Sequence, residues 1–240
     1  MFGRRVVAGI VLAGPVLGAT AALAGPAAAT SPPSNASTLY HQAVATTQSW
    51  SVHYSSASTQ SKQTLLVAGD AGPASGSQTV SMGTGTITIV VIGGITYVKG
   101  NAGGLQNLAG LSASQAAAAS GQWIEFSTNN VAFAQVVVGV RSHDVATQLL
   151  LKGPLSLGRP RTLDGSAVEA IDGTQTFARK EVHVVLYVRA QGTHVPVEED
   201  SVDAKGQPTD AEHVTYSKWG ELVRPLAPQA TVSIGPVRRR

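Results

Sequence analysis

The chain of 240 residues contains no cysteine, which excludes disulfide bonds, thiolate metal sites and lipid attachment through a thioether. Aromatic residues make up only 5% of the sequence and charged residues 13%, about half of the quarter that is usual in soluble domains. Serine, threonine, glycine and alanine supply the polar surface instead. The fold must therefore be stabilised by packing, and its sparsely charged surface suits an exported protein.

The sequence also lacks the short motifs that identify common enzymes. No HExxH or HxxxH spacing places two of the six histidines on one helix face, and neither a GxSxG elbow nor a phosphate-binding loop occurs. Ser142, His143 and Asp144 are consecutive, so their side chains diverge and cannot relay a proton. We predict a protein that is not an enzyme and that has no cofactor and no metal.

The formal charge of +3 is concentrated at the two ends of the chain. Without Arg4, Arg5 and the three arginines at 238–240, 12 of the 17 basic residues remain against 14 acidic ones, a net charge of −2. This balance gives no electrostatic footprint for nucleic acid. We expect 229–240 to form a solvated basic tail, with contact to anionic lipid headgroups as the alternative.

Residues 1–29 have the layout of a secretory signal peptide. Two arginines precede an uncharged run over 6–23, and alanines at 27–29 supply the small residues of a cleavage site. Leu23-Ala24-Gly25 resembles the approach to a bacterial lipoprotein cleavage site, but Pro26 stands where the lipid-bearing cysteine would be. We expect cleavage after Ala29 and a soluble, non-lipidated monomer in the cell envelope or outside the cell; an uncleaved N-terminal anchor is the alternative.

Periodicity separates the rest of the chain into helices and strands. After a flexible lead over 30–36, a helix is predicted from Ser37 to Gln48, followed by strands with apolar residues at every second position. Gly93-Gly94 marks a two-residue hairpin turn. Strands return from Leu155 onward and include three consecutive antiparallel strands over 182–219.

The middle of the chain has a helical character. Ser112 and Gln115 form a capping box for a short alanine-rich helix, and further helices are predicted over 131–140 and 142–151. Three β-branched residues over 136–138 leave a strand as the alternative to the first of these two. The order predicts one α+β domain over 37–228, a large curled antiparallel sheet of about ten strands with helices covering its concave face.

Several segments carry a resemblance to a known family. They are Gly85-Thr86, Ile95 to Lys99, Trp123, Leu163-Asp164-Gly165, Leu186 to Val188, Val195-Pro196 and Thr215 to Gly220. Over most of 37–228 the chain resembles the LolA-like periplasmic carrier fold and, within it, the LppX/LprG-type cell-envelope lipoproteins of actinobacteria. The resemblance implies an incomplete β-barrel whose concave face holds the acyl chains of a lipid or lipoconjugate. It also implies a carrier or chaperone that makes transient contact with the membrane or an envelope protein.

The apolar faces of the strands are the candidate binding site. The residues are Trp50, Val52, Tyr54, Leu65, Val67, Ile87, Ile89, Val91, Val136, Val184 and Leu186. A filled core and a ligand cavity use the same residue types, so the sequence leaves both open. The competing function is an envelope interaction or stress-sensing module without a transported ligand. Glu198-Glu199-Asp200 is expected to form a charged sheet edge that resists aggregation, because adjacent strand residues point to opposite faces.

Overall fold

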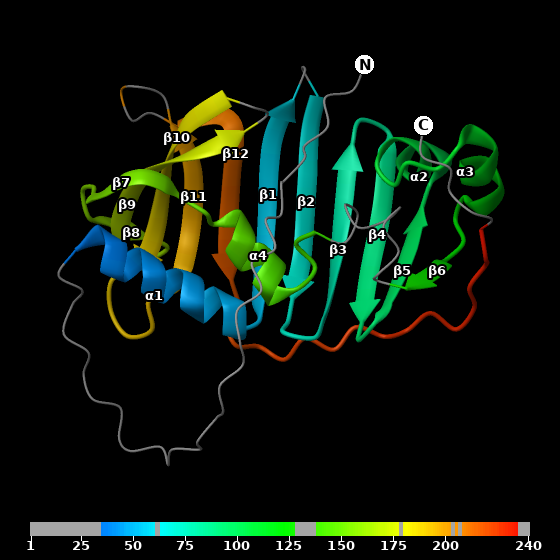
Figure 1. The fold of residues 1–240 in the computed structure, drawn as a ribbon, viewed down its shortest axis with the longest axis horizontal. Helices are drawn as coiled ribbons and strands as arrows, with labels where there is room; N and C mark the ends of the chain where they lie inside the picture. The colour runs from blue at the N-terminus through cyan, green and yellow to red at the C-terminus, as the bar shows by residue number, and fades with distance from the viewer. Residues whose placement is uncertain are drawn as a thin grey trace, which may run out of the picture.

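The computed structural model describes residues 35–60, 63–127, 138–177, 180–202, 205 and 208–234. These parts of the chain form one antiparallel sheet of twelve strands with four helices on one side (Figure 1). The helices are α1 (Ala36–Ser49), α2 (Ala102–Asn107), α3 (Ala113–Ala119) and α4 (Ser142–Gln148). The strands are β1 (Val52–Gln60), β2 (Gln63–Ala71), β3 (Ser75–Met82), β4 (Gly85–Ile92), β5 (Ile95–Gly100), β6 (Ile124–Ser127), β7 (Lys152–Leu157), β8 (Arg161–Leu163), β9 (Ser166–Phe177), β10 (Lys180–Arg189), β11 (Pro196–Val202) and β12 (Pro208–Ser217).

The sheet is an open antiparallel meander whose two halves are joined by the first and last strands. Its order is β6-β5-β4-β3-β2-β1-β12-β11-β10-β9-β7, and β8 pairs with β9. The pairing of β1 with β12 places Tyr54 opposite Tyr216 and brings the two ends of the domain together. Because β6 and β7 stay apart at the two ends of this order, the sheet is not closed into a barrel, as the sequence predicted.

The helices form where their caps and apolar faces indicate, with shifts at their ends. Asn35, rather than Ser37, caps α1 by accepting a hydrogen bond from the Thr38 amide at 2.8 Å. The capping box of Ser112 and Gln115 is confirmed in α3. The helix predicted from 142 ends at Gln148, and the one predicted over 131–140 falls largely on residues that the structure does not describe. Within the described ranges, no helix is long and apolar enough to cross a membrane.

The hydrophobic interior is divided into two main clusters on the helix-covered, concave face. In the first, α1 and α4 pack on β1, β9, β10 and β12 through residues such as Leu39, Leu149 and Leu186. In the second, α2 and α3 pack on β4, β5 and β6 through residues such as Leu105 and Ile89. A smaller cluster of Val168, Ala170, Val185 and Tyr187 lies on the opposite, convex face. The two main clusters share no residue, and α4 connects them, because Val140 just before its N-cap lies in the second cluster while Val145 lies in the first.

The chain after β12 runs along the ends of the strands toward β6 (Figure 1, orange to red). The Val232 amide donates a hydrogen bond to the Trp123 carbonyl at 2.8 Å, and Val232 forms a parallel bridge with Ile124. Val232 and Ile234 also pack against the second cluster. The first part of the segment expected to be a solvated tail is therefore packed on the sheet, whereas 235–240 fall outside the described residues.

Candidate functional site

The concave face of the sheet carries a continuous row of side chains from one pair of helices to the other. Paired residues of antiparallel strands point to the same side of a sheet. The register of six successive pairs gives the row Leu186, Glu199, Val214, Ser56, Val67, Val80 and Ile87. The ends of this row are buried in the two clusters, whereas Ser56, Val67 and Val80 are only half-buried. The helix cover is therefore thinnest in the middle of the sheet.

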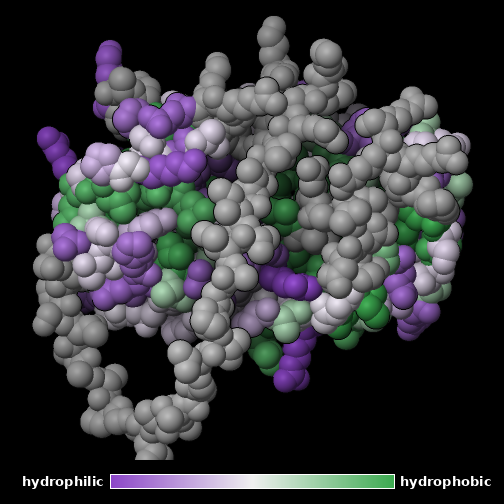
Figure 2. Space-filling view, viewed as in Figure 1, coloured by the Kyte–Doolittle hydropathy of each residue, from purple (hydrophilic) through white to green (hydrophobic). Residues whose placement is uncertain are grey.

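The half-buried inward residues of β1, β2 and β3 define what we call the central strip. Its members are Ser56, Leu65, Val67, Val80 and Met82. Between α4 and α2, the described chain places no helix over the upper parts of these strands (Figure 1). In the same view, hydrophobic residues are visible within recesses of this side (Figure 2). The strip is apolar apart from one serine and links the two hydrophobic clusters.

The predicted site residues divide between the clusters and the strip. Val52, Tyr54, Val184 and Leu186 are buried in the first cluster, and Ile87, Ile89 and Val91 are buried in the second. Leu65 and Val67 lie in the central strip. Trp50 is 40% exposed and lies beside Gly220, away from the row, while Val136 lies outside the described residues. Most of the predicted residues thus pack against the protein's own helices.

Two buried tyrosines tie the helices to the sheet. The Tyr40 hydroxyl donates to the Leu149 carbonyl and accepts from the Leu151 amide, both at 3.1 Å, which joins α1 to the end of α4. The Tyr54 hydroxyl lies 2.7 Å from Gln78 Oε1 and 2.8 Å from the Gly139 carbonyl. Burial raises the pKa of both phenols, so they stay neutral and act as fixed hydrogen-bonding groups.

Glu199 is a buried acid on the concave face, in register with Leu186 and Val214. The residue is only 4% exposed; its Oε1 accepts a hydrogen bond from Gln175 Nε2 at 2.9 Å, and its buried Oε2 has no hydrogen-bond partner. Burial, followed by the negative charge of Glu212, raises the pKa of Glu199 to about 8. At neutral pH this carboxyl is therefore mostly protonated.

The expectation that 198–200 forms a charged edge is wrong. Strand β11 lies between β10 and β12 in the interior of the sheet, so both of its sides are paired. The alternation itself holds, because Glu198 and Asp200 face the convex side while Glu199 faces the helices. The edge interpretation conflicts with the three consecutive antiparallel strands predicted over 182–219, because the middle strand of such a meander has a partner on each side.

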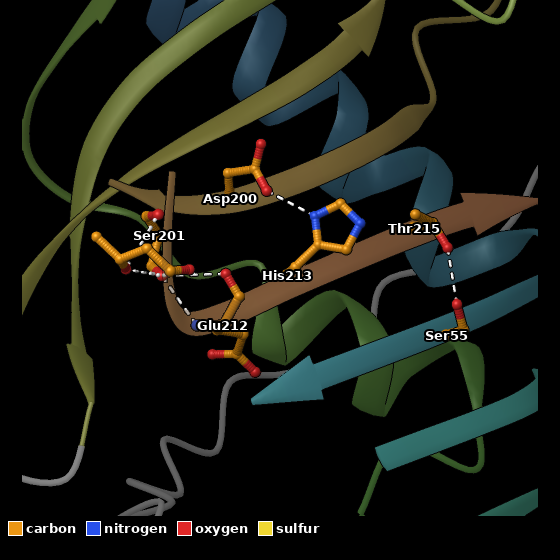
Figure 3. Close-up of polar contacts among 7 residues, drawn as sticks. Ser55, Asp200, Ser201, Glu212, His213 and Thr215 are labelled. Carbon is orange, nitrogen blue, oxygen red and sulfur yellow. Dashed lines mark hydrogen bonds and ion pairs between the residues drawn. The ribbon is translucent and has the colours of Figure 1, made fainter. Parts of the chain in front are cut away.

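On the convex face, Asp200 pairs with His213 of β12, and His213 Nδ1 lies 2.6 Å from Asp200 Oδ1 (Figure 3). Glu198 lies close by, and ligand atoms of these three residues are all within 4.8 Å of one another, close enough to hold a cation. Burial and the neighbouring Asp200 raise the pKa of Glu198. The sequence prediction considered the spacing of histidines on helices, and so did not bring His213 together with these two acids. Register across the hairpin of β11 and β12 is the signal that could have identified it.

Two surface hollows lie away from the helices. The first, about 300 Å³, is lined mainly by outward-facing residues of β1 to β3, including Leu66, which is 51% exposed. The second, about 320 Å³, lies between the ends of β1 to β3 and residues 221–225. Neither is the tunnel between sheet and helices that a preformed acyl-chain site would require.

Comparison with known proteins identifies the fold. No family model and no curated protein matches the sequence. Among solved structures, LprF from Mycobacterium bovis matches with a TM-score of 0.51 and 13% identity, over 83% of this chain and 99% of LprF. Lipoprotein LppX from Mycobacterium tuberculosis matches with a TM-score of 0.46 and 15% identity, over 79% and 97% of the two chains. A LolA superfamily protein from Nitrosomonas europaea matches with a TM-score of 0.29 and 14% identity, over 81% of this chain and 96% of the other. The likeness to LprF shows that this chain has the LolA-like, LppX/LprG-type fold predicted from its sequence.

Proposed function

We propose that this protein is an exported, non-enzymatic carrier or chaperone that binds the acyl chains of a cell-envelope lipid or lipoconjugate against the concave face of its sheet. The observation that supports it most strongly is the central strip, a half-buried apolar surface between the two pairs of helices. An acyl chain laid along the strip would complete the burial of Leu65, Val67 and Val80. The signal-like residues 1–29 support export to the compartment where such lipids occur.

The energetics of the strip favour a chain-like ligand. Each buried methylene contributes about 0.8 kcal/mol, so one additional methylene tightens binding about fourfold until the strip is filled. The strip crosses three strands spaced about 4.8 Å apart, and a chain that extends from it into both clusters would separate the two helix covers. The boundary over the strip is only half-buried, so this separation begins there.

The test combines lipid analysis with a matched pair of variants. Native mass spectrometry of the mature protein from its own host should show bound lipid that solvent extraction removes. Val67→Asn places an amide on the strip and should weaken the binding of a fluorescent fatty acid by about tenfold or more. Ala68→Asn, on the next residue and the opposite face, should leave binding unchanged. Absence of any bound lipid, or equal effects of both variants, would contradict the carrier function.

A second candidate function, an interaction module, is favoured by a different surface. Leu66 on the convex face and Leu222 and Leu226 after β12 are large apolar side chains exposed to solvent. Leu66 lines the hollow over β1 to β3, and an exposed apolar side chain in a hollow is a candidate contact for a partner protein. If a partner protein is retained by the wild type but not by Leu66→Ser, and no lipid is found, this candidate replaces the carrier.

A further inference from the structure

The inward surface of the sheet around Glu199 carries acidic side chains. Among the inward side chains that the structure describes on β10, β11, β12 and β1, Glu199 and Glu212 are acidic and none is lysine or arginine, while Lys180, at an inward register position, lies six residues along β10 from Leu186. The helix that covers them, α1, has no lysine, arginine, aspartate or glutamate in its sequence. Tyr40 and Tyr216, which also face this region, are hydroxyl-bearing and neutral because their pKa values are raised by burial.

Within this surface, Glu199 holds an unused hydrogen-bonding atom. Its Oε2 is buried without a partner, which is unfavourable compared with a satisfied group. In the row across the sheet, Val214 separates Glu199 from Ser56 of the central strip. Two strand spacings, about 10 Å, therefore separate a chain on the strip from this carboxyl. A polar group at the end of such a chain reaches Glu199 when α1 moves away from Val214 of the first cluster.

The chemistry of Glu199 distinguishes between classes of polar group. A phosphate at Glu199 would bring a second acid to a carboxyl that is only 4% exposed, and an uncompensated buried charge is costly. An ammonium would have to be buried as an ion pair, which is repaid only in excellent geometry. A hydroxyl both donates and accepts, so it satisfies Oε2 whether the carboxyl is protonated or ionised.

We propose that the bound lipid is an uncharged amphiphile whose hydroxyl group hydrogen-bonds to Glu199, and that the concave face selects against phosphate-bearing lipids. This inference rests on the proposed carrier function. It assigns Glu199 as the residue that determines the headgroup class, whereas the central strip binds the acyl chains.

The test uses three lipids with identical acyl chains: diacylglycerol, which has a free hydroxyl; phosphatidate, which carries a phosphate there; and triacylglycerol, which has neither. Each is offered at equal mole fraction in phosphatidylcholine vesicles at pH 7, the protein is repurified, and bound lipid is quantified by mass spectrometry. We expect diacylglycerol to be recovered about tenfold or more in excess of both others. In Glu199→Leu, diacylglycerol and triacylglycerol should be recovered in about equal amounts, whereas Glu199→Gln should keep the excess of diacylglycerol.

The outcomes separate this inference from the proposed function. Equal or greater recovery of phosphatidate or triacylglycerol overturns the role of Glu199 but retains the carrier, whereas recovery of none of the three overturns the carrier function. Glu181→Gln removes one acidic side chain from the exposed surface of β10 and serves as the control, with unchanged ratios. If Glu199→Leu fails to fold, the ratios of the wild type and Glu199→Gln still decide the question.

Discussion

Replacing Glu199 by glutamine should make the stability of the protein less dependent on pH. Glutamine has the shape of the protonated acid and can still accept the hydrogen bond from Gln175 Nε2. It cannot ionise, so the variant removes one titration from the first hydrophobic cluster and leaves the packing unchanged. The difference between the wild type and Glu199→Gln then reports the ionisation of this side chain alone.

The direction follows from the pKa values of the two states. The pKa of Glu199 is about 8 in the folded protein, against an ordinary value of 4.5. Below pH 4.5 the acid is protonated in both states and contributes no pH dependence. Between pH 4.5 and 8 the unfolded chain releases its proton while the folded protein retains it, so the free energy of unfolding falls as pH rises. By pH 9 the separation of the two pKa values has lowered the free energy of unfolding by roughly 5 kcal/mol relative to pH 4. This order-of-magnitude figure is comparable to the whole stability of a small domain.

Urea unfolding of both proteins at intervals from pH 4 to 9 measures this difference. The two free energies should agree near pH 4 and diverge with rising pH, with Glu199→Gln the more stable above pH 7. Asp144 and Glu198, whose pKa values burial also raises, titrate in both proteins and cancel in the comparison. Parallel curves across the whole range would refute the conclusion that Glu199 is buried without compensation for its charge.

Two further predictions concern the helix covers. Gly104→Ala should destabilise the protein by about 2 kcal/mol, because the new Cβ would lie 2.2 Å from the Thr86 carbonyl oxygen. Gly103→Ala, where the nearest atoms would be 3.8 Å from the new Cβ, should be neutral or stabilise the protein by up to about 1 kcal/mol. Urea unfolding of the two variants measures both effects. A loss of stability in Gly104→Ala alone would show that close packing of α2, and not a general effect of replacing glycine, is the cause. Tyr40→Phe should lower the free energy of unfolding by about 1–3 kcal/mol in the same assay, because it leaves the buried Leu151 amide without its acceptor. An unchanged unfolding midpoint would contradict the link between α1 and α4.

The parts of the fold that local pattern controls could be predicted from the sequence. Alternation identified the strands, and Gly93, whose φ is +58°, forms the expected turn between β4 and β5. The box of Ser112 and Gln115 fixed the start of α3 because both of its hydrogen bonds are local. These features depend on residues a few positions apart, so no knowledge of the tertiary structure was needed.

The parts that depend on distant contacts could not be predicted. Helix α2 contains Gly103 and Gly104, which disfavour a helix, and it forms because Gly104 allows the backbone to approach Thr86 of β4. The burial of Glu199 likewise depends on distant contacts, because Gln175 of β9 donates to its Oε1 and its partners Leu186 and Val214 belong to the cluster that α1 covers. The candidate site was therefore identified as a set of apolar faces, while its one buried acid was assigned to the wrong environment.

The boundary between the two helix covers determines how the concave face could admit a ligand. The first and second clusters share no residue, and they meet both across the half-buried strip and below it, where the Tyr54 hydroxyl lies against Gln78 and the Gly139 carbonyl. Opening along the strip exposes side chains that are already partly hydrated, so it costs less than exposing Leu39 or Leu105. Without cysteine, no disulfide can fix either cover to the sheet. A spin label on α1 and another on α2 should therefore move apart when a fatty acid binds, and a constant distance would place the ligand elsewhere.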